Sequence, residues 1–513
     1  MEENIIKSKK KPRQKKIIIV VLSLIVTILG VAFSNEFTSF QWQFALIIFL
    51  VSLLAIFFMK KKIEWACLAI ILSFGSFFTI ISPVFDVLDE PAHYARAQHI
   101  SEGNFFLENA EGTLAFSKDY QYLTKLTGYN GMNRLNPTLN FFDSNLFERK
   151  HDETKQIETK IKATRTYGSL MYFPSAAGIY LGKIISNGNL GVMFYLGRFL
   201  NLLMYALMAF FAIKFAGNWK LLLGFFSIQH LPIYISASFS QDAFFYGLSL
   251  LIFSKFIQLF DKEEKINLKD IAVMTIYAVL MVFTKLPYIS LIGLLVFIPF
   301  KRYKNKAVYF TNFLAIIIVL ITAILWLTYY STMEATDLPS SVDQAAQLTF
   351  IFNHPGKFAA SLLHAILDSL LKYKQYFTFG WSFHYSEYAY FVSIAMLGAM
   401  LFMYPMKLRH QINGWFKLAV GGVSLAIIVV TNIILYLTFT GVGESAINGV
   451  QGRYFYGILI LLPFALNIVD RIYVKETLEN NDTVNLTEFT FIILSVSILL
   501  LVWMASLRIG IYY

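Results

Sequence analysis

Long apolar segments recur along almost the whole chain, and they constrain its fold more than any other feature. A transmembrane helix needs about 20 mainly apolar residues to cross a hydrocarbon core of roughly 30 Å. Of the 513 residues, 57% are hydrophobic and only 15% are charged. The pattern predicts an all-α polytopic membrane protein, because a soluble domain could not cover so much apolar surface. Segments that would cross or nearly cross such a core lie at 17–34, 43–59, 64–82, 190–215, 219–237, 240–260, 271–284, 286–300, 308–330, 388–404, 416–440, 454–470 and 488–507.

Basic residues gather in the short connections between these segments. Clusters of lysine and arginine lie at 60–62, 262–269 and 301–306, and residues 1–16 form a basic tail. Cytoplasmic connections of membrane proteins carry an excess of these residues. The net charge of +11 therefore indicates orientation, with a cytoplasmic amino terminus, and we expect no nucleic-acid partner.

Two neighbouring apolar segments, 167–185 and 190–215, decide the number of spans. If both crossed the membrane, every later basic cluster would lie outside it. The first, YGSLMYFPSAAGIYLGKII, contains a proline and internal glycines. Non-helical backbone is tolerated at membrane depth where protein or a water-filled cavity shields it. We interpret this segment as re-entrant or interfacial, which gives about thirteen spans and an outer carboxyl terminus.

This topology divides the chain into a tail at 1–16, two helices at 17–63, a membrane core at 64–470, and a linker with the last helix at 471–513. Two outer loops are long, 84–166 and 331–387. The second contains PGKFAASLLHAILDSLLKYKQYF, whose helical apolar spacing is typical of a helix that lies in the membrane interface. Polar residues that interrupt the membrane pattern fall mainly on the outer side, so we expect the functional surface there.

An acidic pair, Asp89 and Glu90, opens the first outer loop in the sequence DEPAH. A carboxylate at this boundary is suited to accept a proton. The pair would also hold a divalent cation such as Mg²⁺ or Mn²⁺, although with His93 it gives too few ligands for a full shell. Because Pro91 favours a helix start, the acids equally fit a helix cap. His93 and Arg96, one turn apart on that helix, fit either a solvated face or an anion site.

Three further charged residues lie at the outer ends of apolar segments. Arg453, in VQGRYFYG, fits a phosphate-binding guanidinium or a side chain that reaches the lipid headgroups. Lys285, in FTKLPY, fits an anionic ligand or a lipid phosphate. Asp242, in SFSQDAF, fits a helix start at which Ser238 or Ser240 is the cap.

Arg198 and Asn201, in LGRFLNLL, lie inside a predicted span. A charge at that depth needs a partner. Asp242 or Asp89 would serve, which would give Arg198 a structural role. The chain contains no phosphate-binding loop of nucleotide hydrolases, no Cys/His metal spacing and no nucleophile elbow, which excludes a nucleotide-driven pump in this chain.

The sequence segments around these polar residues resemble a family of bacterial polytopic membrane proteins. That family is catalogued as domain of unknown function 2142. That family is in turn similar to glycosyltransferases of the C fold (GT-C), which carry an acidic pair in the first large outer loop. The resemblance extends from about 65 to 470, in the family's order, over DEPAH with the following YARAQHISEGN, then YGSLMYFPSAAGIYLGK, LGRFLNLL, PIYISASFSQDA, TKLPY and VQGRYFYG.

The resemblance implies an enzyme of the bacterial cytoplasmic membrane that transfers a sugar at the outer face. The donor would be a polyprenyl-phosphate-linked sugar, and the acceptor a cell-surface glycan or another component of the cell envelope. Asp89 or Glu90 would be the base that activates the acceptor hydroxyl, while Arg453, helped by Lys285, would hold the carrier's phosphate. Substrate or structural contacts would come from His93, Arg96, Arg198, Asn201 and Asp242.

Two other functions fit the same sequence. A transporter or flippase for lipid-linked cell-envelope polysaccharide would use Arg198, Asp242 and Arg453 along a pathway and would need no base. A non-catalytic partner of a polysaccharide-assembly complex would tolerate carboxamide replacements at Asp89 and Glu90. Most charged residues lie at the outer ends of the predicted spans, which favours the enzyme.

Overall fold

The structure is a computed structural model of the whole chain. It describes residues 2–32, 39–59, 61–87, 89–106, 113–127, 145–160, 164, 167–331, 341–371, 387–403, 408–466 and 486–512.

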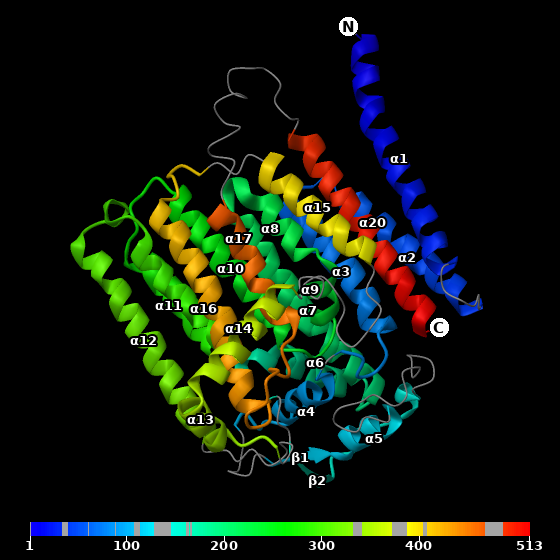
Figure 1. Cartoon of the computed structure of the whole chain (residues 1–513). Coiled ribbons are helices and arrows are strands. Elements are labelled where there is room, and N and C mark those ends of the chain that lie inside the picture. Colours follow the sequence, from blue (N-terminus) through cyan, green and yellow to red (C-terminus); the bar gives the residue numbers. More distant parts are fainter. Residues whose placement is uncertain are drawn as a thin grey trace.

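A bundle of apolar helices forms the body of the molecule (Figure 1). In the described ranges, seven helices are long and apolar enough to cross a membrane: α1 (Glu2–Ala32), α3 (Ile63–Ile81), α7 (Leu190–Lys214), α10 (Asp242–Asp261), α12 (Lys306–Ser331), α16 (Gly414–Thr438) and α20 (Leu486–Tyr512). Shorter apolar helices are α2 (Ser39–Phe58), η4 (Leu286–Phe297), α15 (Glu387–Met403) and the pair η7 (Gly452–Phe455) and α17 (Tyr456–Leu466). A many-helix membrane protein is therefore confirmed, whereas the count of about thirteen spans stays a prediction.

Two predicted spans differ from single α-helices. The segment 219–237 forms η3 (Gly217–Trp219), α8 (Lys220–Ser227) and α9 (His230–Ser236), with extended backbone at Gln229. Pro232 explains the break, because its ring would clash with the carbonyl group four residues earlier, at Ile228. The segment 286–300 forms the 3₁₀ helix η4, which begins at Leu286–Pro287, and it follows α11 (Leu268–Val282).

Helix α7 and the short helix before it, α6 (Phe173–Ile185), form a helical hairpin. The 3₁₀ turn η2 (Ser169–Tyr172) leads into α6, which packs along α7. Gly178 and Gly182 allow this packing, because a Cβ at either position would lie within 2.7 Å of the α7 backbone. At 13 residues and a rise of about 1.5 Å each, α6 is too short to cross a bilayer, so it lies beside only half of α7.

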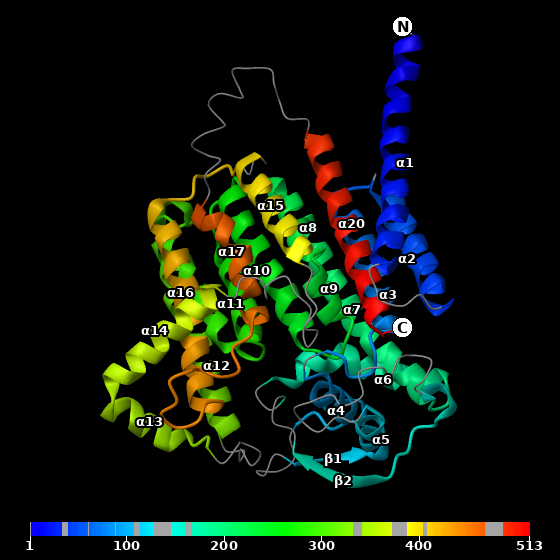
Figure 2. The same cartoon turned by 45° about the vertical axis from the view of Figure 1, so that its right-hand side comes forward.

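A small polar layer covers one end of the bundle (Figure 2). It contains α4 (Glu90–Ser101), β1 (Thr113–Ser117), α5 (Lys118–Thr127), η1 (Leu146–Glu148) and β2 (Lys155–Lys160). The two strands form an antiparallel sheet, which is the departure of the described residues from an all-helical fold. Helix α4 packs against α6, so the layer is attached to the bundle through the α6–α7 hairpin.

The second long loop also contains helices, α13 (Gln344–Asn353) and α14 (Pro355–Leu371), and both pack against α16. Their position in a membrane interface stays a prediction. At the other side of the molecule, α1 and α2 pack together and against α20, so the helices from the two ends of the chain are neighbours (Figure 1).

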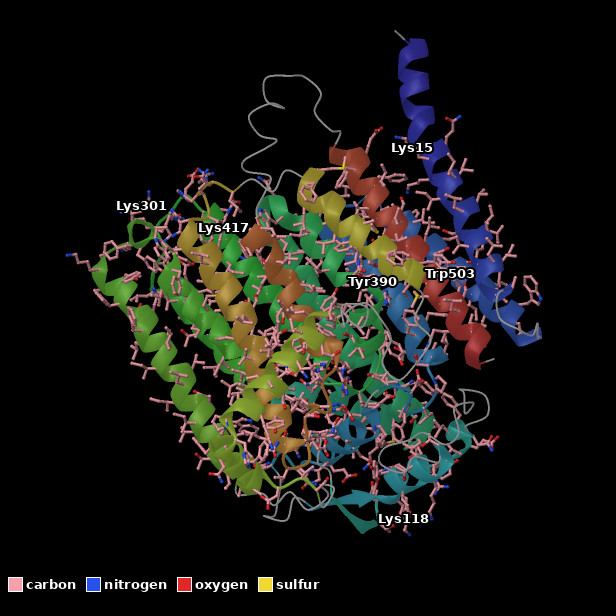
Figure 3. All side chains as sticks on the ribbon, viewed as in Figure 1. Lys15, Lys118, Lys301, Tyr390, Lys417 and Trp503 are labelled. Carbon is pink, nitrogen blue, oxygen red and sulfur yellow. The ribbon has the colours of Figure 1, made fainter. Side chains whose placement is uncertain are left out.

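Lysines from the predicted cytoplasmic side and from the first predicted outer loop lie at opposite ends of the bundle (Figure 3). Lys15, Lys301 and Lys417 lie in the upper part of the view, whereas Lys118 lies at the bottom, in the polar layer (Figure 3). This separation agrees with basic connections on one side of a membrane and a polar surface on the other. Which side is cytoplasmic stays a prediction. The connection at 299–303 includes η5 (Phe300–Arg302).

Candidate functional site

Four charged side chains from distant parts of the chain meet where the polar layer joins the bundle. Arg453, in η7, lies at the centre: its Nη2 donates to Asp89 Oδ2 at 2.9 Å, and its Nη1 is 3.6 Å from Asp242 Oδ2. Lys285, which follows α11, places its Nζ 3.1 Å from Asp242 Oδ1. Two carboxylates and two cations therefore form one continuous cluster.

Exposure differs sharply within this cluster. The Asp89 side chain is 36% exposed, while that of Arg453 is 6% and that of Asp242 3% exposed. Within the described structure, Nε and Nη1 of Arg453 are buried and have no hydrogen-bond acceptor. The Lys285 ammonium lies 4.2 Å from the centre of the Tyr454 ring. The cluster thus combines an accessible carboxylate, Asp89, with a buried guanidinium, Arg453, two of whose nitrogens form no hydrogen bond in the described structure.

The backbone of Asp89 directs its side chain toward Arg453. Asp89 immediately precedes α4 in the left-handed conformation, with φ 60° and ψ 9°. Its side chain makes no cap hydrogen bond to the helix, so the cap interpretation is wrong for this residue. A non-glycine residue in this region is uncommon, and such backbone strain is concentrated at functional sites.

Glu90, the neighbouring acid, is fully buried against Arg198. The guanidinium has five N–H donors, and five acceptors surround it: both Glu90 carboxylate oxygens and the carbonyl oxygens of Thr79, Ser82 and Pro83. The backbone amide of Phe239 also donates to Glu90. The sequence-based expectation that Asp242 or Asp89 pairs with Arg198 is therefore wrong, because Glu90 and the end of α3 occupy every donor.

His93 and Arg96 are buried rather than solvated, with exposures of 3% and 2%. His93 Nδ1 lies 2.8 Å from the Tyr172 hydroxyl. Burial lowers the pKa of His93 to about 4, although the Asp89 and Asp242 carboxylates oppose this shift. Arg96 donates to Ser169 Oγ at 2.6 Å and to the carbonyl oxygen of Phe105, and burial lowers its pKa. Both side chains therefore join α4 to the η2 segment, and the solvated-face interpretation is wrong.

Asn201 fixes the start of α10. Its side-chain amide donates to the carbonyl oxygens of Ser238 and Ser240. Ser240 Oγ in turn accepts from the backbone N–H of Asp242. The cap position of α10 is nevertheless Gln241, whose side chain makes no cap bond, so the expected serine cap is wrong. The bonds of Asn201 and Ser240 hold Asp242 at the depth where Lys285 and Arg453 reach it.

Sequence reasoning missed the aromatic residues around the cluster and a second buried ion pair. The centre of the Tyr167 ring lies 5.8 Å from the centre of the His93 ring and 5.8 Å from Lys285 Nζ. Burial raises the pKa of Tyr167, so its hydroxyl stays protonated. Asp86 pairs with Arg508 of α20 and accepts from the Tyr234 hydroxyl at 2.6 Å. A lone arginine directly after the last apolar segment was the signal that could have revealed this pair.

The expected divalent cation at Asp89 and Glu90 does not fit the arrangement. Each carboxylate faces a guanidinium, and within the described ranges no group of three or more His, Cys, Asp or Glu side chains could hold a metal ion. Both carboxylates are instead paired with arginine side chains, Asp89 with Arg453 and Glu90 with Arg198.

One protein family matches the chain, under the description "Predicted membrane protein (DUF2142)", over residues 72–462. The match covers more than half of the chain, so the protein belongs to this family. It includes Asp89, Asp242, Lys285 and Arg453, and it excludes α1, α2 and α20. No curated protein and no solved structure matches the chain.

Proposed function

We propose that the protein is a GT-C-like membrane glycosyltransferase, which moves a sugar from a polyprenyl-phosphate-linked donor to a cell-envelope acceptor at the outer face of the membrane. The observation that carries the proposal is the buried Arg453 guanidinium: Nη2 donates to Asp89, Nη1 lies 3.6 Å from the Asp242 carboxylate, and neither Nη1 nor Nε has a hydrogen-bond acceptor in the described structure. Together with Lys285, it forms a two-cation site suited to a phosphate group.

Phosphate binding would also activate the base. Asp89 and Asp242 balance the charges of Arg453 and Lys285. A donor phosphate at Arg453 competes with the Asp89 carboxylate for the guanidinium. Asp89, the exposed member of the cluster, is then free to accept a proton from an acceptor hydroxyl that arrives from water.

The transfer is a single displacement at the anomeric carbon. Asp89 takes the proton of the acceptor hydroxyl as that oxygen attacks the anomeric carbon. The bond from the anomeric carbon to the phosphate oxygen breaks, the oxygen keeps the electron pair, and polyprenyl phosphate leaves. Arg453 and Lys285 stabilise the charge that develops on the leaving phosphate. The product has inverted configuration, because the base and the leaving group lie on opposite faces of the sugar.

Glu90 has a positioning role in this proposal. Its carboxylate is enclosed by Arg198 and two backbone amides, so it has no access to a hydroxyl group. It joins the segment before α4 to α7 and thereby holds Asp89 opposite Arg453. Of the two acids, we therefore assign the base to Asp89.

The transporter alternative has less support. It requires Arg198 along a pathway, but every Arg198 donor is engaged by Glu90 and the α3 end. Moving that side chain would expose a buried charge and several carbonyl oxygens, which is costly.

The test is the composition and linkage of cell-surface polysaccharide in strains that carry Asp89→Asn or Arg453→Ala at equal membrane expression. We expect one sugar linkage to disappear in both strains. The matched control is Glu153→Gln, which removes an exposed carboxylate of the polar layer and should leave every linkage intact. If Asp89→Asn also leaves every linkage intact, the assigned base is wrong and a non-catalytic role in assembly becomes the better account.

A further inference from the structure

A buried carboxylate in the polar layer, that of Asp119, joins three segments of that layer. Asp119 lies in the first turn of α5, and its side chain is fully buried. Its Oδ2 accepts hydrogen bonds from His151 Nδ1 and from Gln98 Nε2 of α4, the latter at 3.3 Å. Its Oδ1 accepts from the backbone N–H of Asp152 at 3.2 Å. In the part of the chain that the structure describes, His151 is the one basic side chain within ion-pair distance of Asp119.

The backbone around His151 is bound to the turn between α6 and α7. The His151 N–H donates to the carbonyl oxygen of Gly188 at 2.7 Å. Gly188 has φ 78°, a conformation that glycine adopts without strain. Asn189, the N-cap residue of α7, donates through its side chain to the carbonyl oxygen of Phe147 at 2.6 Å. His151 therefore joins the polar layer to the α6–α7 hairpin, because its side chain binds α5 and its backbone binds the turn.

Most of the charged side chains around His151 are paired with one another: Lys183 of α6 with Glu153 at 2.5 Å, and Lys118 of α5 with Asp152 at 3.6 Å. The main cause that raises the pKa of His151 is its hydrogen bond to Asp119. Glu102, at the end of α4, also raises this pKa, whereas partial burial and Lys183 lower it. The pKa of His151 therefore lies above its ordinary value of 6.5.

The charge of His151 decides how strongly Asp119 is held. A neutral imidazole still donates one hydrogen bond from Nδ1, but it leaves a buried carboxylate without an opposite charge, which is costly. Because the folded protein binds this proton more tightly than the unfolded chain does, the stabilisation is fully present below about pH 6.5 and is lost as the pH rises through the raised pKa. This sign is opposite to that of His93, whose pKa is lowered by burial.

We propose that the Asp119–His151 pair is a pH-sensitive clasp, which holds the polar layer on the α6–α7 hairpin while His151 is charged and loosens when His151 loses its proton. The clasp also reaches α4, since Gln98 shares the Asp119 carboxylate and α4 begins directly after Asp89. It is independent of the reaction at the charged cluster, so it goes beyond the proposed function. In the proposed orientation, the clasp responds to the pH outside the cell.

The test is hydrogen exchange of the purified full-length protein between about pH 6 and 9, a range around the ordinary pKa of histidine and above it. Rates are expressed as protection factors, which remove the intrinsic pH dependence of exchange. We expect the protection of α5 and of residues 146–152 to fall severalfold across this range, because local opening becomes easier as the clasp weakens. His151→Gln retains a hydrogen-bonding group but does not titrate, so its protection should be low and independent of pH.

A second variant and a matched control accompany this measurement. Asp119→Asn removes the carboxylate and should also abolish the pH dependence, so the result does not rest on one substitution. His354→Gln changes an exposed histidine between α13 and α14 and should keep the wild-type pH dependence. Unchanged protection of α7 and α10 shows that the bundle of each variant is folded.

Two results would overturn the clasp. Protection that does not change with pH in the wild-type protein would mean that His151 is no switch. An equal fall in wild type, His151→Gln and Asp119→Asn would mean that another group carries the pH dependence. Both results leave the assignment of Asp89 and Arg453 to sugar transfer untouched, because exchange in the polar layer is measured without any substrate.

Discussion

At the scale of single residues, two adjacent acids have different environments. Asp89 is partly exposed and contacts a guanidinium with spare donors, whereas Glu90 is buried and its oxygens are fully engaged. Removing one partner of a buried ion pair leaves an uncompensated charge and costs about 3–5 kcal/mol. We therefore expect Glu90→Gln to lower the free energy of unfolding by about that amount, and Asp89→Asn to change it by less than about 1 kcal/mol. Thermal unfolding of both purified variants checks this; equal stability of Glu90→Gln and wild type would contradict the positioning role.

The buried His93 predicts a dependence of stability on pH. Its pKa is lowered from 6.5 to about 4, so the unfolded chain binds its proton at higher pH than the folded protein does. The contribution of His93 is fully present above about pH 6.5 and is lost as the pH falls toward 4, by at most about 3 kcal/mol. Burial is the main cause of the lowered pKa. Of the four charged groups around His93, Asp89 and Asp242 raise its pKa, while Arg453 and Lys285 lower it.

We expect His93→Gln to unfold with a weaker pH dependence than wild type between pH 6.5 and 4, because glutamine does not titrate. Glutamine retains a hydrogen-bonding group for Tyr172, so packing changes little. The measurement is the unfolding midpoint of both proteins across that range. A pH dependence that is identical in the two proteins would show that His93 does not carry it.

At the scale of elements, the long helices were predictable and the irregular ones were not. The predicted segments 64–82, 190–215 and 416–440 agree closely with α3, α7 and α16. In a long apolar segment the backbone N–H and C=O groups have no water to bind, so they form the hydrogen bonds of a helix. The break between α8 and α9 was predictable only from Pro232. The pairing of Glu90 with Arg198 was not predicted: Asp242 and Asp89 were the expected partners, and only the packing of the start of α4 against α7 and the end of α3 selects Glu90.

The α6–α7 hairpin gives a prediction at the same scale. A Cβ at Gly178 would lie 2.4 Å from the carbonyl oxygen of Leu196, and backbone atoms cannot move aside as a flexible side chain does. We expect Gly178→Leu to separate α6 from α7 and lower the free energy of unfolding by about 1–3 kcal/mol, with loss of the sugar linkage because η2 and its contacts with His93 shift. The matched control is Gly421→Ala in α16, where no heavy atom lies within 4 Å of the added Cβ, and which should be neutral or slightly stabilising. Unchanged stability of Gly178→Leu would show that the hairpin is not tightly packed.

At the scale of the whole molecule, helices from both ends of the chain lie outside residues 72–462, the part that matches the family, and α20 contacts that part directly. Helix α20 lies beyond residues 72–462, yet its Arg508 forms a buried ion pair with Asp86, three residues before Asp89. Tyr234 of α9 joins the pair, since its hydroxyl donates to Asp86 and accepts from Arg508 Nη2 at 3.0 Å. The last helix therefore supports the segment that carries Asp89, although it lies outside the family match.

A double-mutant cycle tests this support. Arg508→Met alone leaves the buried Asp86 carboxylate without its cation, so we expect a loss of about 3–5 kcal/mol in the free energy of unfolding. Asp86→Asn combined with Arg508→Met removes both charges and should cost clearly less than the sum of the single changes, because the two residues interact directly. The matched control is Lys15→Met, which breaks an exposed ion pair between α1 and Glu488 of α20 and should cost no more than about 1 kcal/mol. Additive losses at Asp86 and Arg508 would mean that α20 packs against the core without supporting the Asp89 segment; a large coupling, together with loss of the sugar linkage in Arg508→Met, would make α20 a working part of the site.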